Sequence, residues 1–265
     1  DDFALADDYE WTMGQFVWTG FDYLGEPSPY DTDAWPNHSS MFGIIDLASI
    51  PKDRYYLYRS IWNKKEKTLH ILPHWNWKGR EGKETPVFVY TNYPTAELFI
   101  NGRSYGKQTK NDSTVQNRYR LMWMNAIYEP GEVKVVAYDN KGNAVDEKTV
   151  KTAGKPHRIE LIPDRTQLSA DGKDLVYINV RVVDKDGNLC PLDQRMINFS
   201  VKGKGKYRAA ANGDPTNLDL FHLPKMPLFN GQLTAIAQAA EEKGELIFEA
   251  KAKGLKTATV EIDVK

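Results

Sequence analysis

Two carboxylates close together in the sequence are the first candidates for chemistry. Asp22 and Glu26 follow a short apolar run and lie four residues apart. Paired carboxylates carry out glycoside hydrolysis, and retaining enzymes hold them about 5–5.5 Å apart. Four residues of extended strand span roughly 13 Å, a distance that only a turn at 25–27 would shorten. The spacing weighs against a catalytic pair, and we expect both groups to accept hydrogen bonds from the backbone or a neighbour.

Trp18 lies at the end of the same apolar run, where a barrel strand would end. In one interpretation its indole is a platform for the apolar face of a sugar ring. In the other it packs in a hydrophobic core. Its position alone leaves both interpretations open.

Other clusters carry weaker signals. Residues 74–77 read HWNW, and two Trp beside a polar residue could bind sugar, but we favour a plug between two domains. Residues 212–217 read NGDPTN, which alternates oxygen donors but lacks the bidentate Glu and the spacing of a calcium-binding loop.

The single Cys190 cannot form an internal disulfide. We predict no metal site and no cofactor, since no ligand spacing links the histidines His38, His70, His74, His157 and His222.

Bulk composition excludes several classes of protein. The formal net charge is -1 over 265 residues with both signs interspersed, so we expect no nucleic-acid partner. No apolar stretch approaches the roughly 18 residues of a membrane span, so we expect no membrane partner. The chain begins without Met, and we expect it to be a segment of a longer protein.

The elements that would position these residues fall into three regions. Residues 1–66 predict a buried strand within 14–23, a loop of Gly, Pro and polar residues over 25–40, and a helix over 51–62. Pro51 suits the first helical position of that helix. A single strand, loop and helix cannot bury itself, so this region must pack on something larger.

The remaining regions read as β-sandwiches. Short alternating strands recur through residues 67–153, and Asn101-Gly102 is a strong hairpin signal. The same pattern of short alternating strands recurs over 156–265, after a linker at 152–156. Strands at this spacing predict two immunoglobulin-like sandwiches.

Several motifs together resemble one enzyme family. Residues 16–27 (FVWTGFDYLGEP) are similar to the eighth barrel strand and following loop of family 2 glycoside hydrolases, particularly the bacterial β-galactosidase branch. Further resemblances to that branch follow in the same order over the whole chain, at 42–47 with 51–58, 74–77, 96–106, 212–216 and 229–231.

The resemblance implies a mainly β chain with two immunoglobulin-like β-sandwich domains preceded by the last βα unit of a TIM barrel. The boundaries would be 1–66 for the remnant of the (β/α)8 catalytic barrel, 67–153 for the first sandwich and 156–265 for the second. In this family the catalytic glutamates stand on earlier barrel strands, so the resemblance implies no catalytic residue in this chain and no activity by itself. The family's eighth-strand Trp lines the sugar subsite, which favours the substrate-binding interpretation of Trp18.

The parent protein implied by the resemblance is a retaining hydrolase of terminal β-galactosides, with carbohydrate as its partner. We expect a periplasmic or extracellular location. Glucuronidases and mannosidases share the barrel, so the sugar stays open. Two other functions compete: a carbohydrate-binding module and a structural spacer. Without the rest of a barrel, we expect residues 1–66 either to fold back on the first sandwich through Trp75 and Trp77 or to mediate self-association.

Overall fold

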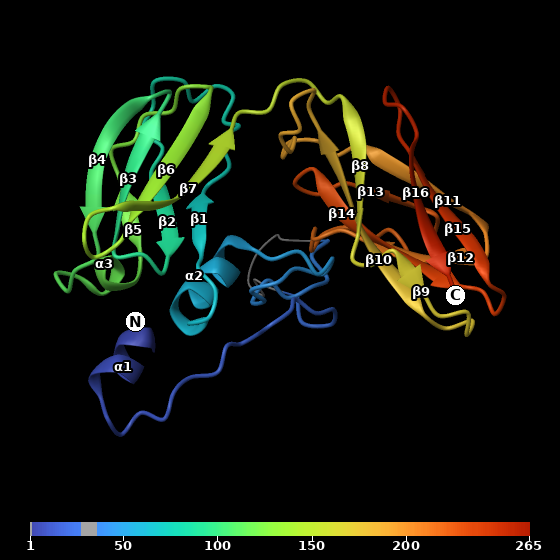
Figure 1. Cartoon of the computed structure of the whole chain (residues 1–265), viewed down its shortest axis with the longest axis horizontal. Coiled ribbons are helices and arrows are strands. Elements are labelled where there is room, and N and C mark those ends of the chain that lie inside the picture. Colours follow the sequence, from blue (N-terminus) through green and yellow to red (C-terminus); the bar gives the residue numbers. More distant parts are fainter. Residues whose placement is uncertain (1, 28–35) are drawn as a thin grey trace. The chain divides into compact units, whose positions relative to one another are not determined.

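The computed structural model describes residues 2–27 and 36–265, and its fold is mainly β (Figure 1). The chain divides into two compact units, Asp1–Gly20 with Pro51–Thr152 and Phe21–Ile50 with Ala153–Lys265. The N-terminal region is therefore shared between the units. No helix in the described ranges is long and apolar enough to cross a membrane.

The first unit is built on a β-sandwich of antiparallel sheets. One sheet has the order β1-β2-β5 and the other β4-β3-β6-β7, which is the strand division of an immunoglobulin-like fold. Its strands are β1 (Leu69–Leu72), β2 (Val87–Thr91), β3 (Thr95–Ile100), β4 (Arg103–Thr109), β5 (Leu121–Trp123), β6 (Glu132–Tyr138) and β7 (Ala144–Lys151).

Alternation along the strands makes the core of this sandwich. On β3, the side chains of Ala96, Leu98 and Ile100 are fully buried while those between them are half-buried. The predicted Asn101-Gly102 hairpin joins β3 to β4, and both turn residues have positive φ, 49° and 79°. This is the backbone that a tight hairpin requires, so the hairpin prediction is confirmed.

Three helices accompany the first sandwich in the described ranges: α1 (Asp2–Asp8), α2 (Asp53–Trp62) and α3 (Val115–Tyr119). The helix predicted over 51–62 is confirmed as α2, although Lys52 is the N-cap, so Pro51 precedes the helix instead of starting it. The side chain of Asn92, just after β2, donates to the carbonyl oxygens of Ser60 and Asn63 at 2.9 and 3.1 Å. The end of α2 is thereby fixed to the sandwich.

The strand predicted within 14–23 is wrong for residues 14–20. The structure assigns no strand to residues 14–20, and the side chains of Phe16 and Trp18 are largely exposed. An apolar run forms a strand only where neighbouring strands accept its hydrogen bonds. Part of the loop predicted over 25–40, residues 28–35, lies outside the described residues.

The second unit contains another sandwich, with sheet orders β12-β14-β10-β8 and β13-β11-β15-β16-β9. Its core includes the fully buried side chains of Val180, Leu233 and Phe248. Its strands are β8 (Arg158–Pro163), β9 (Gln167–Leu168), β10 (Leu175–Val183), β11 (Met196–Gly203), β12 (Gly205–Ala211), β13 (Lys225–Pro227), β14 (Gln232–Ala239), β15 (Gly244–Lys251) and β16 (Ala258–Val264).

Candidate functional site

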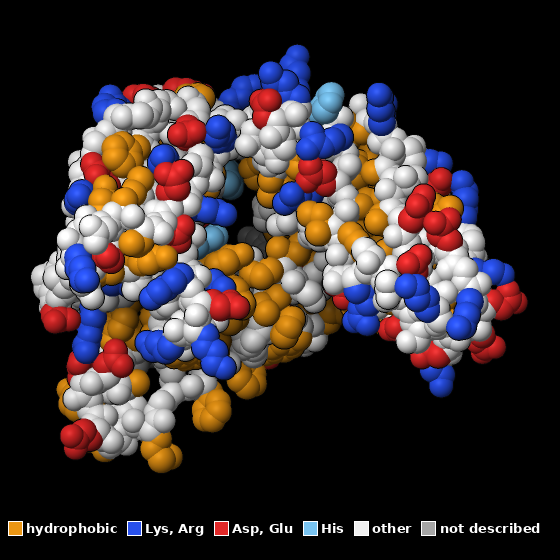
Figure 2. All heavy atoms as spheres, viewed as in Figure 1, with side chains coloured by type: hydrophobic (Ala, Val, Ile, Leu, Met, Phe, Trp, Pro, Cys, Tyr) orange, Lys and Arg blue, Asp and Glu red, His pale blue; other side chains and the backbone are white. Residues whose placement is uncertain are grey.

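Trp18 lies outside the cores of both sandwiches. It is 71% exposed, on the stretch of chain that precedes the second unit. Large apolar side chains at Trp11, Met13 and Phe16 are exposed on the same stretch. Figure 2 accordingly shows apolar side chains at the surface along the N-terminal stretch, which Figure 1 draws in blue. The indole of Trp18 is thus accessible to a ligand and does not serve as a core residue of this chain.

The two carboxylates that follow Trp18 make structural hydrogen bonds. Asp22 is buried, and its Oδ1 accepts from the backbone N–H of Gly43 at 2.8 Å. A Cβ on Gly43 would lie 2.2 Å from the Asp22 nitrogen, so only glycine permits this approach. Glu26 accepts a hydrogen bond from the Tyr23 hydroxyl. Asp22 thus binds the backbone and Glu26 binds a neighbouring side chain, as expected for carboxylates that are not a catalytic pair.

Part of the N-terminal region is bound to the second sandwich, which the sequence analysis did not predict. We call residues 36–50 the docked segment. The backbone N–H of His38 donates to the carbonyl of Pro215 at 3.0 Å, and its Nε2 lies 2.7 Å from the carbonyl oxygen of Asn217. Since a carbonyl only accepts, Nε2 carries the proton in this contact.

The other end of the docked segment is also bound to the second sandwich. Asp46 Oδ1 accepts from the backbone N–H groups of Ala48 and Ile50 at 2.8 and 2.9 Å, which closes a turn. The hydroxyl of Thr234, on β14, donates to the carbonyl of the buried Ala48 at 2.7 Å. A Cβ on Gly213 would lie 2.0 Å from Asp46 Oδ2. The first contact needs the hydroxyl of Thr234, and the second needs a residue without a side chain at position 213.

The loop 212–217 uses its oxygens to fold itself. Asn212 Oδ1 accepts from the backbone N–H of Asp214, and Asp214 Oδ1 accepts from the N–H and the hydroxyl of Thr216. Within the described ranges no cluster of three or more metal-binding side chains occurs. The alternation of oxygens seen in the sequence therefore serves turns and the docked segment.

The aromatic cluster at 74–77 belongs to the core of the first sandwich. Trp75 is buried there, its Nε1 donates to the carbonyl of Glu129 at 2.9 Å, and its ring meets Tyr128 edge to face. The prediction that Trp75 fills a junction between domains is wrong, because its ring is buried in the core of one sandwich. His74 stacks on Trp77, and burial lowers the pKa of His74 against the opposing effect of Asp53.

The N-terminal helices also reach the first sandwich by a route other than the one predicted. Helix α2 packs on β1 and β2, and Arg59 donates to the hydroxyl of Thr68 at 2.9 Å. Phe3 of α1 packs against Tyr58 and Trp62 of α2. Folding back through Trp75 is thus corrected to folding back through α2, since Trp75 is already buried by its own sandwich.

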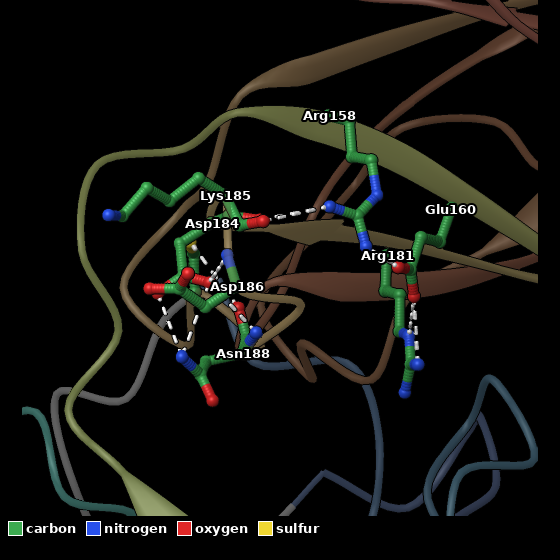
Figure 3. Close-up of polar contacts among 8 residues, drawn as sticks. Arg158, Glu160, Arg181, Asp184, Lys185, Asp186 and Asn188 are labelled. Carbon is green, nitrogen blue, oxygen red and sulfur yellow. Dashed lines mark hydrogen bonds and ion pairs between the residues drawn. The ribbon is translucent and has the colours of Figure 1, made fainter.

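Asp184 organises the beginning of the second unit (Figure 3). Its carboxylate accepts from the backbone N–H groups of Gly154, Asp186 and Asn188 and from the Asn188 side chain. Burial alone would raise the pKa of Asp184, but these hydrogen bonds outweigh it and lower the pKa to about 2. Beside this loop, Glu160 bridges two guanidinium groups (Figure 3), those of Arg158 and Arg181. No ligand-binding arrangement follows from either network.

The folds and contacts above define a chain of accessory β-sandwiches with an exposed aromatic stretch. Residues 159–261 match Glycoside hydrolase family 2 C-terminal domain 5, and residues 82–146 match a domain of unknown function, DUF4982. The β-galactosidase BoGH2A of Bacteroides ovatus is 42% identical over 262 residues, 98% of this chain and 29% of that protein. A β-glucuronidase of Formosa agariphila is 27% identical over 221 residues, 82% of this chain and 21% of its own length.

Solved structures agree with the sequence relatives. A family 2 glycosyl hydrolase from Bacteroides cellulosilyticus superposes with a TM-score of 0.89 at 30% identity, over 99% of this chain and 37% of that one. The chain belongs to glycoside hydrolase family 2, in the region of its C-terminal domains. It spans less than a third of the length of the curated relatives named here.

Proposed function

We propose that this chain is the C-terminal portion of a retaining glycoside hydrolase that acts on terminal β-galactosides. The observation that carries the proposal is the 42% identity with a protein named β-galactosidase over 98% of this chain. More distant relatives are named β-glucuronidases, and their identity to this chain is lower. The preference for galactosides rests on that difference.

Residues 1–66 are, in this proposal, the remnant of a (β/α)8 barrel, followed by sandwiches at 67–153 and 156–265. The apolar run at 14–20 would form a barrel strand beside neighbours supplied by the longer protein, and α2 would be the helix that covers it. Trp18 would then stand at the sugar subsite, where its exposed indole supplies a flat apolar surface. A sugar stacked on it would be positioned for attack at the anomeric carbon.

This chain alone is expected to hydrolyse nothing. Asp22 and Glu26 are engaged in structural hydrogen bonds, and a retaining mechanism needs a nucleophile and an acid/base at matched separation. The test compares the longer enzyme with this chain on nitrophenyl β-galactoside and nitrophenyl β-glucuronide. The proposal requires the longer enzyme to prefer the galactoside and this chain to be inactive. Preference for the glucuronide would reassign the substrate, and turnover by this chain that Asp22→Asn abolishes would refute its inactivity.

The exposed stretch also carries a proposal about association. Large apolar side chains at Trp11, Met13, Phe16 and Trp18 face solvent in this chain. Such a surface promotes association in a protein that lacks its natural covering. We therefore propose that the isolated chain self-associates through residues 1–66. Light scattering should give a mass above the 30.2 kDa of one chain, and polar substitution at Trp11 and Phe16 should restore that mass.

A further inference from the structure

A pocket lies where α1, α2 and α3 meet, at one end of the first sandwich (Figure 1). Phe3 of α1 contacts the rings of Tyr58 on α2 and Tyr119 on α3, at centroid distances of 5.1 and 5.4 Å. The hydroxyl of Tyr119 donates to Asp7 at 2.8 Å, which ties α1 to α3. The pocket is thus formed within the first unit, and direct contacts fix its aromatic wall.

Two arginines, Arg54 on α2 and Arg120 directly after α3, also line the pocket. The guanidinium carbon of Arg54 lies 5.8 Å from the ring centroid of Tyr58. That of Arg120 lies 5.7 Å from the centroid of Phe88. In residues 2–27 and 36–265, neither arginine side chain forms an ion pair or a hydrogen bond. Attraction of a cation to a ring face uses none of its in-plane N–H donors, so these donors remain available to an anion.

Neighbouring carboxylates do not neutralise the pocket. Asp7 binds Tyr119, and Asp8 of α1 accepts from Arg118 Nη1 at 2.6 Å. Asp53, next to Arg54 in the sequence, lies 2.7 Å from Nε2 of His70. The described side chains that line the pocket include two arginines and no carboxylate, so the charge that faces a ligand is positive.

Arg120 also has a hydrogen-bonding group that no partner satisfies. Its Nε is buried and has no acceptor within the described part of the chain. A buried N–H without an acceptor is unfavourable. The fork of a guanidinium matches the two oxygens of a carboxylate, which accept two parallel N–H bonds. A carboxylate bound to this guanidinium would therefore bring an acceptor to a side chain that has none.

The size of the pocket limits the ligand. Its volume is about 150 Å³. One water molecule needs roughly 10–15 Å³ of such space, so the pocket holds on the order of ten waters or one small molecule. We infer that this pocket binds a small organic carboxylate, whose charged group meets Arg54 and Arg120 and whose apolar part lies against the aromatic wall of Phe3, Tyr58 and Tyr119. The inference does not depend on the proposed function.

The first measurement is the binding of para-fluorobenzoate to the 265-residue chain, followed by fluorine NMR. The matched ligand is para-fluorobenzamide, which has nearly the same shape and no charge. The carboxylate should bind saturably and at least about tenfold more tightly than the amide, because hydrogen bonds to a charged group are stronger than those between neutral groups. Equal affinity for the two ligands, or no saturable binding of the carboxylate, would overturn the inference.

Substitutions then locate the site. Arg54→Gln and Arg120→Gln should each weaken the binding of para-fluorobenzoate at least about fivefold. Arg103→Gln is the matched control, since Arg103 also lies over a ring, 5.3 Å from the centroid of Tyr105, but is already paired with Glu129. Its affinity should equal that of the unaltered chain. Arg54 is exposed, so Arg54→Gln leaves the packing intact and decides the test if Arg120→Gln lowers the melting temperature.

Unchanged affinity in Arg54→Gln would place the ligand elsewhere and overturn the inference. A loss of equal size in Arg103→Gln would do the same, because binding would then follow the net charge of the chain. Inorganic sulfate tests the class of ligand. It should displace para-fluorobenzoate only at concentrations at least about tenfold higher than those of unlabelled benzoate, since it has no apolar part. Equal displacement by sulfate would overturn the assignment to organic carboxylates.

Discussion

Replacing Asp184 by alanine removes the carboxylate that closes the 184–188 loop and binds the start of the second unit. Three backbone N–H groups, those of Gly154, Asp186 and Asn188, lose an acceptor at 2.8–2.9 Å. A hydrogen bond to a charged group contributes about 1.5–3 kcal/mol, but water satisfies part of the need once the loop opens. We expect Asp184→Ala to lower the free energy of unfolding of this unit by about 3 kcal/mol.

Asp186 offers a matched control two residues away. Its side chain is exposed, and Asp186→Ala removes the same atoms while keeping the backbone N–H that Asp184 binds. Urea unfolding followed by circular dichroism at pH 7 should show a clear loss for Asp184→Ala and a change within about 0.5 kcal/mol for Asp186→Ala. Equal losses in the two variants would refute the argument that the carboxylate of Asp184 organises the loop.

The pH dependence gives an independent check. The pKa of Asp184 is about 2 in the folded chain, below its unfolded value of about 3.9. The carboxylate therefore stabilises the fold fully above the unfolded pKa, and the contribution is lost as the pH falls toward 2. Asp184→Asn cannot titrate, so its unfolding free energy should fall less steeply than that of the unaltered chain between pH 5 and about 2. Parallel pH profiles would contradict the assignment.

Further expectations concern the platform, the two cores and the helix that packs on the first. In the longer enzyme, Trp18→Ala should lower kcat/KM at least about tenfold and leave the melting temperature unchanged. A lower melting temperature with retained activity would make Trp18 a core residue. Leu98→Ala, in the core of the first sandwich, should cost about 3 kcal/mol in urea unfolding, and a loss below about 1 kcal/mol would mean that the core is loosely packed there. Burial raises the pKa of the Cys190 thiol to about 11, so iodoacetamide at pH 8 should label it far more slowly in the folded chain than in urea; equal rates would show the thiol to be accessible. Asn92→Ala should release the end of α2, seen as faster hydrogen exchange over 53–62, and protection equal to that of the unaltered chain would show that packing alone holds the helix.

Local signals accounted for much of the fold. Strand alternation at Glu132–Tyr138 and the hairpin at Asn101-Gly102 are properties of a few neighbouring residues, and both are present in the structure. The helix over 51–62 was predicted by spacing and forms as α2. Helices α1 and α3 were missed because they are short and carry no apolar periodicity that outweighs their polar residues.

The features that escaped the sequence are those set by distant partners. The strand expected around Phe16 does not form among the described residues, and a local sequence pattern cannot show whether neighbouring strands are present. The docked segment depends on contacts such as that of His38 with Asn217, which lie 179 residues apart. Glycines at 43 and 213 were the available signal, since each stands where a side chain would collide with the docked segment or its partner. Their role is visible only once the partner residues are known.

The division of the chain between the units has a topological consequence. The polypeptide passes from the first unit to the second after Gly20, returns after Ile50 and passes over again after Thr152. Three peptide connections join the units, and a protease that cuts at 152–156 breaks the last of them while leaving the noncovalent contacts between the docked segment and the terminal sandwich. A terminal sandwich expressed from Ala153 onward would lack the docked segment and leave the surfaces around Gly213 and Thr234 uncovered. The sandwiches are consecutive in the sequence, but the second unit also takes residues 21–50 from the N-terminal region, so a cut at the linker leaves part of that unit on the other fragment.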